Sequence, residues 1–303
     1  MRRDKKRASK EGIALLVTVM FVIVITVAIG FGLKQVNTAA SEIKKENFMY
    51  QSTLLVEDVL NILKNSPDIK SVVDSNSSDN LYIFLSQAAF IPFEVSGLEI
   101  ILKVSSARSK FHPSSLDGNN SALMRQYLNN YGINSQYVEI LADNFGGIKE
   151  DNSYNSRIFD EKPYLFRDYI ASSAHLKEIN DFYAKEYNEN SLSKIDFNNL
   201  FYFSHDSNVS IDLNYATPEV WELMLGTSRE RAEELSIGGG AYSTNDDLGL
   251  NDDEIRNLGL FKTSFFEPIL FVEIEIAQNG SSSKISFEYD IRAQKGSNFV
   301  YEI

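Results

Sequence analysis

The feature that most constrains this chain is an unbroken apolar run at residues 13–33, which contains no charged side chain. Its 21 residues match the length of about 20 that a helix needs to cross a hydrocarbon core of about 30 Å. Six of the residues 1–12 are Lys or Arg, and the positive-inside rule places such a flank in the cytoplasm. The run therefore predicts one membrane-spanning helix, a cytoplasmic leader over residues 1–12 and export of everything after Lys34.

Two simpler interpretations of the same run stay open. A secretory signal peptide has an apolar region of about 7–15 residues that ends at a small-residue cleavage site. Here the run is longer, and no such site comes before Lys34. A plain signal anchor needs only an apolar run behind a basic flank, and both are present.

A glycine marks the junction between the leader and the run. Gly12 stands in the sequence Ser-Lys-Glu-Gly-Ile-Ala-Leu-Leu, and this resembles the leader of type IV pilins and pseudopilins. In those proteins prepilin peptidase cuts after a glycine and methylates the new N-terminus. The resemblance implies cleavage between Gly12 and Ile13 and N-methylation of Ile13. A residue without a side chain lets a membrane protease approach the backbone closely.

The helical pattern continues beyond the membrane. Residues 34–65 contain neither Pro nor Gly, and their apolar side chains recur near the helical period. Asn65-Ser66-Pro67 predicts the end of the helix. A helix from Ile13 to that point is about 80 Å long at about 1.5 Å per residue. We expect residues 34–66 to continue the membrane helix and residues 67–303 to form the exported domain.

The pattern of the exported domain indicates an α+β fold. Alternation and β-branched content predict strands at residues 81–85, 98–104, 209–213, 269–277, 284–291 and 298–302. The fourth and fifth of these predict a β-hairpin through residues 278–281. Helices are predicted at 119–131 and 172–188, the second with Ser172 or Ser173 as its N-cap, and the stretch between them is irregular with short helices. This order gives an antiparallel sheet interrupted by a large helical insertion at about residues 119–262.

Residues 217–258 carry the signals of three short helices. Thr217 suits an N-cap, and Pro218 suits the first helical position. Capping-box spacing recurs twice, as Thr227 with Glu230 and as Asn251 with Glu254. We interpret Gly238-Gly239-Gly240 as a flexible turn, because the Lys-Ser or Lys-Thr of a phosphate-binding loop does not follow it.

The same region carries a family resemblance. Ile211-Asp212-Leu213-Asn214-Tyr215-Ala216 and the following Val220-Trp221-Glu222-Leu223 are similar to a stretch in the C-terminal region of a minor pseudopilin family of type II secretion, general secretion pathway protein K. Asp252–Glu254 with Gly259-Leu260, and residues 164–183, align with two further helical steps of that family. Most pilins have glutamate five residues after the cleavage point, whereas this family typically lacks it, and Val17 occupies that position here. The departures are Ile13 for the commoner Phe, Asp212 for Asn, Tyr215 for Thr, and Leu141-Ala142-Asp143 for a Trp-x-Asp step.

The resemblance implies a pilin-like fold, in which the long N-terminal helix packs on the antiparallel sheet. It implies a minor pseudopilin without enzymatic activity, placed at the tip of a periplasmic pseudopilus and held in the bacterial inner membrane by one helix. Its expected partners are other minor pseudopilins, the major pseudopilin and prepilin peptidase. A minor pilin of a type IV pilus-like machine and a signal-anchored periplasmic binding protein are the alternatives.

Composition argues against several other functions. The formal net charge is −13, and the body behind the basic leader is strongly acidic, which opposes contact with nucleic acid. The absence of cysteine excludes disulfides, thiol catalysis and thiolate metal sites. His112, His175 and His205 lack metal-ligand spacing, and we expect them at the surface. We expect no catalytic residue.

One metal hypothesis is left. Five acidic residues lie in the irregular stretch, namely Asp143, Glu150, Asp151, Asp160 and Asp168. Hard cations such as Ca²⁺ bind clusters of oxygen ligands, and the family resemblance adds that pseudopilins often carry structural calcium. No EF-hand pattern is present, and a solvated acidic loop is the alternative. Apart from such calcium we expect no cofactor.

Overall fold

The computed structural model describes residues 20, 22, 40–75, 77–95, 98–278 and 281–302. The chain divides into two compact units, Met1–Ala107 with Pro268–Ile303, and Arg108–Glu267. The predicted α+β class is confirmed, because helices are combined with an antiparallel sheet. The predicted membrane segment lies outside the described residues, except for Met20 and Val22. Within the described ranges no helix has both the length and the apolar character to cross a bilayer.

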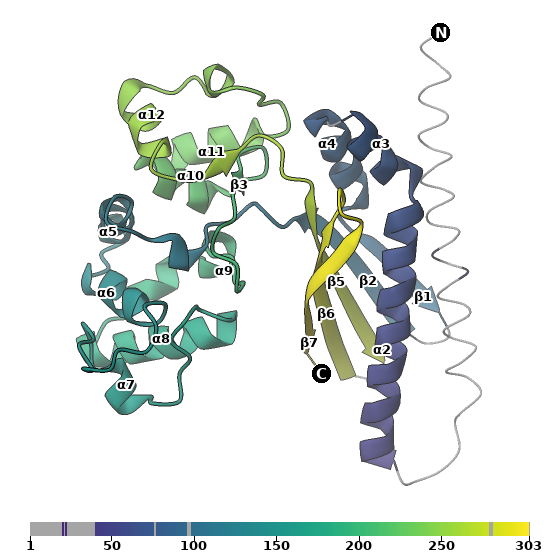
Figure 1. Cartoon of the computed structure of the whole chain (residues 1–303), viewed down its shortest axis with the longest axis horizontal. Helices are drawn as coiled ribbons and strands as arrows, with labels where there is room; N and C mark the ends of the chain where they lie inside the picture. The colour runs from purple at the N-terminus through teal and green to yellow at the C-terminus, as the bar shows by residue number, and fades with distance from the viewer. Residues whose placement is uncertain are drawn as a thin grey trace. The chain divides into compact units, whose positions relative to one another are not determined.

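The first unit is built around a five-stranded antiparallel sheet (Figure 1). In spatial order its strands are β1 (Ile91–Val95), β2 (Leu98–Ser106), β5 (Ile269–Gln278), β6 (Ser281–Asp290) and β7 (Lys295–Glu302). The predicted hairpin is the antiparallel β5–β6 pair. β2 pairs with β5 so that Ser106 lies opposite Leu270. The chain of the second unit therefore starts and ends at two neighbouring strands.

Helix α2 (Ala40–Asn65) runs along this sheet (Figure 1). Its buried side chains Leu55, Val56, Val59 and Leu63 recur at helical spacing, so one face of the helix contributes to the core. Leu60 approaches β7 closely, because a Cβ added to Gly296 would lie 2.9 Å from Leu60 Cδ2. The helix ends at Asn65 as predicted, and α3 (Pro67–Ser75) begins at the proline.

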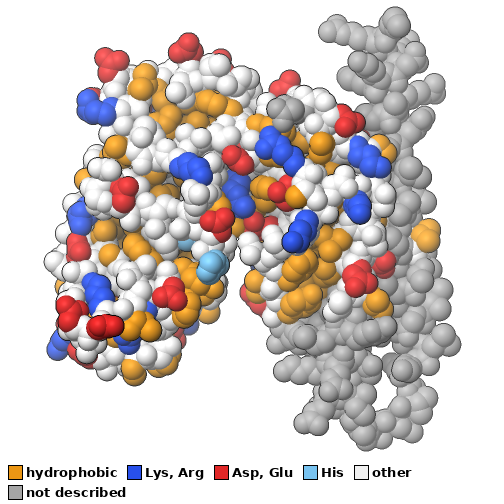
Figure 2. All heavy atoms as spheres, viewed as in Figure 1, with side chains coloured by type: hydrophobic (Ala, Val, Ile, Leu, Met, Phe, Trp, Pro, Cys, Tyr) orange, Lys and Arg blue, Asp and Glu red, His pale blue; other side chains and the backbone are white. Residues whose placement is uncertain are grey.

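The two faces of the sheet differ in chemistry. Alternate residues of β2 and β5 are apolar and buried, namely Ile100, Leu102, Val104, Leu270, Val272, Ile274 and Ile276. On the other face Lys103 Nζ lies 2.6 Å from Glu275 Oε1, and Lys284 Nζ lies 2.5 Å from Glu273 Oε2. This alternation is typical of an antiparallel sheet with one face in the core and one in solvent. Over both units, the surface in Figure 2 shows acidic and basic side chains interspersed.

The predicted strand at residues 81–85 is wrong. These residues lie in helix α4 (Ser78–Ala88), which buries Leu81, Phe84, Leu85 and Ala88. Their spacing places the four side chains on one face of a helix. A run of five apolar residues does not by itself distinguish a strand from the buried face of a helix.

The second unit is mainly helical (Figure 1). Its α-helices are α5 (Ser121–Asn130), α6 (Gln136–Asp143), α7 (Ile158–Glu161), α8 (Ser173–Tyr187), α9 (Phe197–Leu200), α10 (Pro218–Leu225), α11 (Arg229–Ile237) and α12 (Asp252–Leu258). The 3-10 helices are η1 (Pro113–Ser115), η2 (Ser191–Lys194) and η3 (Asn245–Leu248). The predicted strand at 209–213 is reduced to β3 (Ile211–Asp212), which pairs in parallel with β4 (Thr263–Ser264). The sequence places the insertion at about 119–262, and this unit runs from Arg108 to Glu267.

Most helix starts in this unit agree with the sequence signals. Thr217 caps α10 with Pro218 as its first residue, Ser172 caps α8, and Asn251 forms a capping box with Glu254 at α12. The capping box predicted for Thr227 and Glu230 is wrong. The N-cap of α11 is Ser228, whose hydroxyl accepts a hydrogen bond from Arg231 N at 3.4 Å. Because a Thr and a Ser stand side by side, the sequence spacing alone selects the wrong hydroxyl.

Candidate functional site

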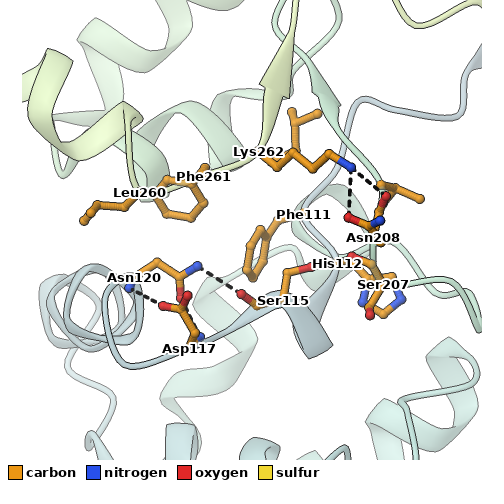
Figure 3. Close-up of a pocket in the computed structure, with 12 residues that line it drawn as sticks. Phe111, His112, Ser115, Asp117, Asn120, Ser207, Asn208, Leu260, Phe261 and Lys262 are labelled. Atoms are coloured by element: carbon orange, nitrogen blue, oxygen red, sulfur yellow. Dashed lines mark hydrogen bonds between the residues drawn. The ribbon is translucent and has the colours of Figure 1, made fainter.

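A cavity of 220 Å³ lies within the second unit (Figure 3). Its lining comes from the segment around η1, from residues 207–211 and from the segment after α12. Phe111 and Phe261 supply apolar surface, with ring centroids 5.7 Å apart in an edge-to-face arrangement. This volume is below the range of about 300–1,000 Å³ that is usual for small-molecule sites. The polar side chains around the cavity decide what it can do.

His112 on this lining is buried, with 2% of its surface exposed. Its Nδ1 accepts a hydrogen bond from Ser114 N at 3.2 Å, so the ring proton is on Nε2, which donates to Ser204 O at 2.8 Å. Burial lowers the pKa of His112 and keeps the ring neutral. Both ring nitrogens are used, and His112 is neither a free base nor a metal ligand in this arrangement.

The expectation that all three histidines lie at the surface is wrong for two of them. His175 is also buried, and its Nδ1 accepts from Ala171 N at 3.3 Å. His205 is exposed as predicted, and its ring contacts Tyr169. Sequence spacing tests for shared metal coordination, but it does not report the burial of a single imidazole.

The remaining polar groups of the cavity bond to one another (Figure 3). Asp117 Oδ1 accepts from Asn119 N at 2.7 Å and from Asn120 N at 3.1 Å. Lys262 Nζ donates to both Asn208 O and Asn208 Oδ1, at 3.0 and 2.9 Å. The lining therefore provides a partly enclosed surface with hydrogen-bonding groups. None of the described lining residues is a nucleophile that is hydrogen-bonded to a base.

The segment that carries the family resemblance is a hub of hydrogen bonds. Asn214 Oδ1 accepts from Gly240 N and Tyr242 N, both at 2.9 Å. Asn214 Nδ2 donates to Tyr242 O at 2.9 Å and to Phe265 O at 2.8 Å. One buried amide thus joins the turn after α11 to the segment after β4, with all of its hydrogen-bonding capacity satisfied.

This hub explains the glycine run, which forms the predicted turn and is closely packed. A Cβ added to Gly239 would lie 2.3 Å from Asn214 O, closer than any real contact allows. Gly240 has φ of 90°, a conformation that favours glycine. The run is a close-packed turn against Asn214.

Asp212 is the second polar residue of the motif and is fully buried. Its Oδ1 accepts from Asn214 N at 3.0 Å, and its Oδ2 accepts from Glu267 N at 2.7 Å. Burial raises the pKa of Asp212 to about 7. Both oxygens act as acceptors, which an Asn side chain with its single oxygen could not reproduce.

The five calcium candidates occupy different environments. Asp143 is buried, and its carboxylate accepts four hydrogen bonds, from the main-chain N–H and the side chains of Asn155 and Ser156. Glu150, Asp151, Asp160 and Asp168 are exposed. In the described part of the chain, no group of three or more His, Asp or Glu side chains is arranged to hold a metal ion. Calcium binding stays a prediction, and Asp143 has its lone pairs occupied by donors.

Sequence reasoning missed a buried charge cluster at the start of α10 and α11. Glu219 and Glu222 are 7% and 4% exposed. Arg229 Nη1 lies 2.8 Å from Glu219 Oε1, and Tyr131 donates to Glu222 Oε2 at 2.8 Å. Burial raises the pKa of Glu222, and burial together with this hydrogen bond raises that of Tyr131 to about 12. The spacing of two glutamates three apart on one helix face was the available signal, and the cluster ties three segments together.

The predicted processing and assembly residues, Gly12, Ile13 and Val17, lie outside the described residues, so their roles stay predictions. Neither the models of known protein families nor the sequences of characterised proteins match this chain.

Proposed function

We propose that this chain is a minor pseudopilin of a type II secretion system, located at the tip of a periplasmic pseudopilus. Residues 13–33 would anchor it in the bacterial inner membrane after prepilin peptidase removes residues 1–12. Its role would be to start assembly, with other minor pseudopilins docking on the long helix and the major pseudopilin following. This role supports protein export and requires no catalysis.

The observation that supports the proposal best is the arrangement of α2. One face of this helix buries Leu55, Val56, Val59 and Leu63 in the core of the sheet unit. The same helix follows the apolar run in the sequence, separated from it by residues without Pro or Gly. In the proposed pilin-like fold, α2 would hold the helix to its domain, and the segment before α2 would serve the membrane and neighbouring subunits.

The helical unit between β2 and β5 is the second support. It adds Arg108–Glu267 to the sheet unit without breaking the β2–β5 pairing. A subunit stacked within a filament shaft has neighbours above and below, and so large an addition would obstruct them. A subunit at the tip has no neighbour above.

Labelling of filaments tests the proposal directly. A gold-labelled antibody against the second unit should mark one end of each pseudopilus, and the filaments should be missing when the chain is missing. Label along the shaft would contradict the tip position. Filaments that form normally without the chain would contradict the assembly role.

The cavity of the second unit is the observation that favours a signal-anchored periplasmic binding protein instead. Its polar side chains already bond to one another, which weakens that alternative. Processing separates the two, because a binding protein held by a plain signal anchor keeps its leader. A minor pilin of a type IV pilus-like machine would lose its leader in the same way. In that case the gold label would appear on a pilus and not on a pseudopilus.

A further inference from the structure

The face of the sheet that points away from the core, here called the outer face, carries a groove of about 450 Å³. The groove lies at the end of the sheet where β2 and β6 begin and β5 and β7 end. Every residue of its lining belongs to the first unit. The lining residues on the outer face are Glu99 and Ile101 of β2, Glu275 and Ala277 of β5, Lys284 of β6 and Glu302 of β7.

Four charged side chains of the outer face neutralise one another. Lys103 Nζ lies 2.6 Å from Glu275 Oε1 and 3.3 Å from Glu273 Oε1. Lys284 Nζ lies 2.5 Å from Glu273 Oε2. Two lysines therefore balance the two glutamates that project from β5.

Two carboxylates of the groove are left over. The side chains of Glu99 and Glu302 are exposed, and neither forms an ion pair with a residue that the structure describes. The apolar surface between and beside them comes from the half-buried Ile101 and Ala277 and from the alkyl stem of Lys284. The groove therefore combines apolar surface with an excess of two negative charges, one on β2 and one on β7.

Strand pairing fixes the separation of these two carboxylates. Glu302 lies opposite Lys284, and Lys284 lies opposite Glu275. Glu275 in turn lies opposite Ile101, so three strand spacings separate β7 from β2, and Glu99 stands two residues before Ile101. At about 4.8 Å per strand spacing and about 3.3 Å per residue, the two backbone positions are about 16 Å apart.

An occupant that complements this groove carries two cations at that separation, with apolar side chains between them. The main-chain groups of the inner strands are already paired within the sheet, so an extended segment lying across the face would leave its own N–H and C=O groups without partners. A helix satisfies these groups internally. At about 1.5 Å and about 100° per residue, positions i and i+11 of a helix lie about 16 Å apart on the same side, with positions i+4 and i+7 between them.

We propose that the groove binds a basic amphipathic helix of another protein, whose Lys or Arg side chains at positions i and i+11 pair with Glu99 and Glu302. Its apolar side chains at i+4 and i+7 contact Ile101, Ala277 and the stem of Lys284. Exposed ion pairs contribute little each, so the binding is weak and decreases as salt is added. The proposal goes beyond the role in secretion and does not rest on it, because it uses only the groove.

Two synthetic peptides test the proposal. The first is a fluorescent helical peptide rich in alanine and glutamine, with lysines at its third and fourteenth positions and leucines at its seventh and tenth. In the second, the later lysine is moved to the twelfth position, which keeps the charge but places this lysine on the opposite side of the helix. Fluorescence anisotropy with the full chain in non-ionic detergent should show about fivefold tighter binding of the first peptide. Equal binding of both peptides would show attraction without the proposed geometry and would overturn the proposal.

Two double variants of the chain locate the binding. Glu99→Gln with Glu302→Gln should weaken binding of the first peptide by about tenfold and remove its advantage over the second. Glu57→Gln with Glu230→Gln makes the same change of charge at exposed residues that do not line the groove, and it should leave binding unchanged. An equal loss in both double variants, or no loss in the first, overturns the assignment to the groove. A dimer of the chain alone in sedimentation velocity that only the first double variant abolishes would make a second copy the occupant and would also overturn the proposal.

Discussion

Asn214 satisfies every hydrogen-bonding group of its side chain inside the second unit. The carboxylate of Asp143 likewise accepts hydrogen bonds from Asn155 and Ser156. Neither side chain forms an ion pair with a described residue, and neither lines the cavity. Each fixes the path of a loop through its hydrogen bonds. Buried polar residues of this kind carry stability because an unpaired buried group costs about 1–3 kcal/mol.

The close packing at the glycine turn gives a stability prediction. Gly239→Ala places a Cβ 2.3 Å from Asn214 O, so the turn must shift and the free energy of unfolding should fall by about 1–3 kcal/mol. Gly118→Ala is the matched control, because a Cβ there meets nothing within 4 Å, and its effect should stay within about 0.5 kcal/mol. Urea unfolding of both variants measures the difference. Equal urea midpoints for the two variants would show that the turn can shift without a loss of stability.

A single glycine in the leader gives the processing prediction. Gly12→Val adds a branched side chain where the peptidase must reach the backbone, so unprocessed protein should accumulate in the membrane. Gly30→Val makes the same change inside the apolar run and should leave cleavage intact. N-terminal sequencing of protein made together with prepilin peptidase gives the result. A mature N-terminus at Ile13 in the Gly12 variant would remove the support for this motif.

At the scale of helices and strands, the sequence was most informative where local chemistry decides the structure. The caps of α8, α10 and α12 follow from side-chain hydroxyl, amide and carboxyl groups that bond within three residues. The β5–β6 hairpin follows from alternation on both sides of a short turn. The α4 segment was predicted as a strand because a short apolar run does not show which other segments pack against it. Those segments decide which of its side chains are buried.

The candidate site was harder to predict than the fold. The His112–Ser204 bond, the hub at Asn214 and the Tyr131–Glu222 bond all depend on segments distant in sequence. Spacing within one segment carries no information about those partners. The acidic stretch shows the converse, since its five members are close in sequence while one is buried and four are exposed.

The acidic stretch between α6 and α8 gives the calcium prediction. If it binds Ca²⁺, a hundredfold excess over the dissociation constant should stabilise the fold by about 2.7 kcal/mol. Thermal melting of the full chain with calcium and with chelator measures this, and Asp168→Asn should reduce the difference. Asp206→Asn, at an exposed residue outside the stretch, should leave it unchanged. Identical midpoints with and without calcium would rule the site out.

For the whole molecule, the pairing of β2 with β5 predicts that the sheet unit tolerates removal of the helical unit. Ala107 and Ile269 stand opposite each other, so an Asn-Gly turn in place of residues 108–268 would form a two-residue hairpin. The shortened chain should keep its strand signal in circular dichroism and should unfold cooperatively. A chain that lacks this transition would show that the sheet depends on the helical unit.

Val17 gives the prediction for the assembled filament. A glutamate at this position in pilins lies in an apolar bundle, where an unpaired carboxylate is costly, and it pairs with the N-terminal ammonium of the subunit above. If this chain is the tip subunit, as proposed, it has no such neighbour, and Val17→Glu should be tolerated or mildly harmful for export. The number of filaments per cell and the amount of secreted cargo measure this. Export that rises well above the original level would mean that the chain normally stacks as a shaft subunit.

The insertion of the second unit between β2 and β5 also sets the order in which the two units can fold. The second unit is one continuous stretch of chain, Arg108–Glu267, so it can begin to fold as soon as its own residues have been synthesised. The sheet must wait, because β2 has no inner neighbour until β5 emerges near the end of the chain. During that interval β1 and β2 form a two-stranded ribbon, which is marginally stable alone. Chains halted at this stage would carry a folded helical unit and an unfinished sheet, and they would be the form most exposed to proteases.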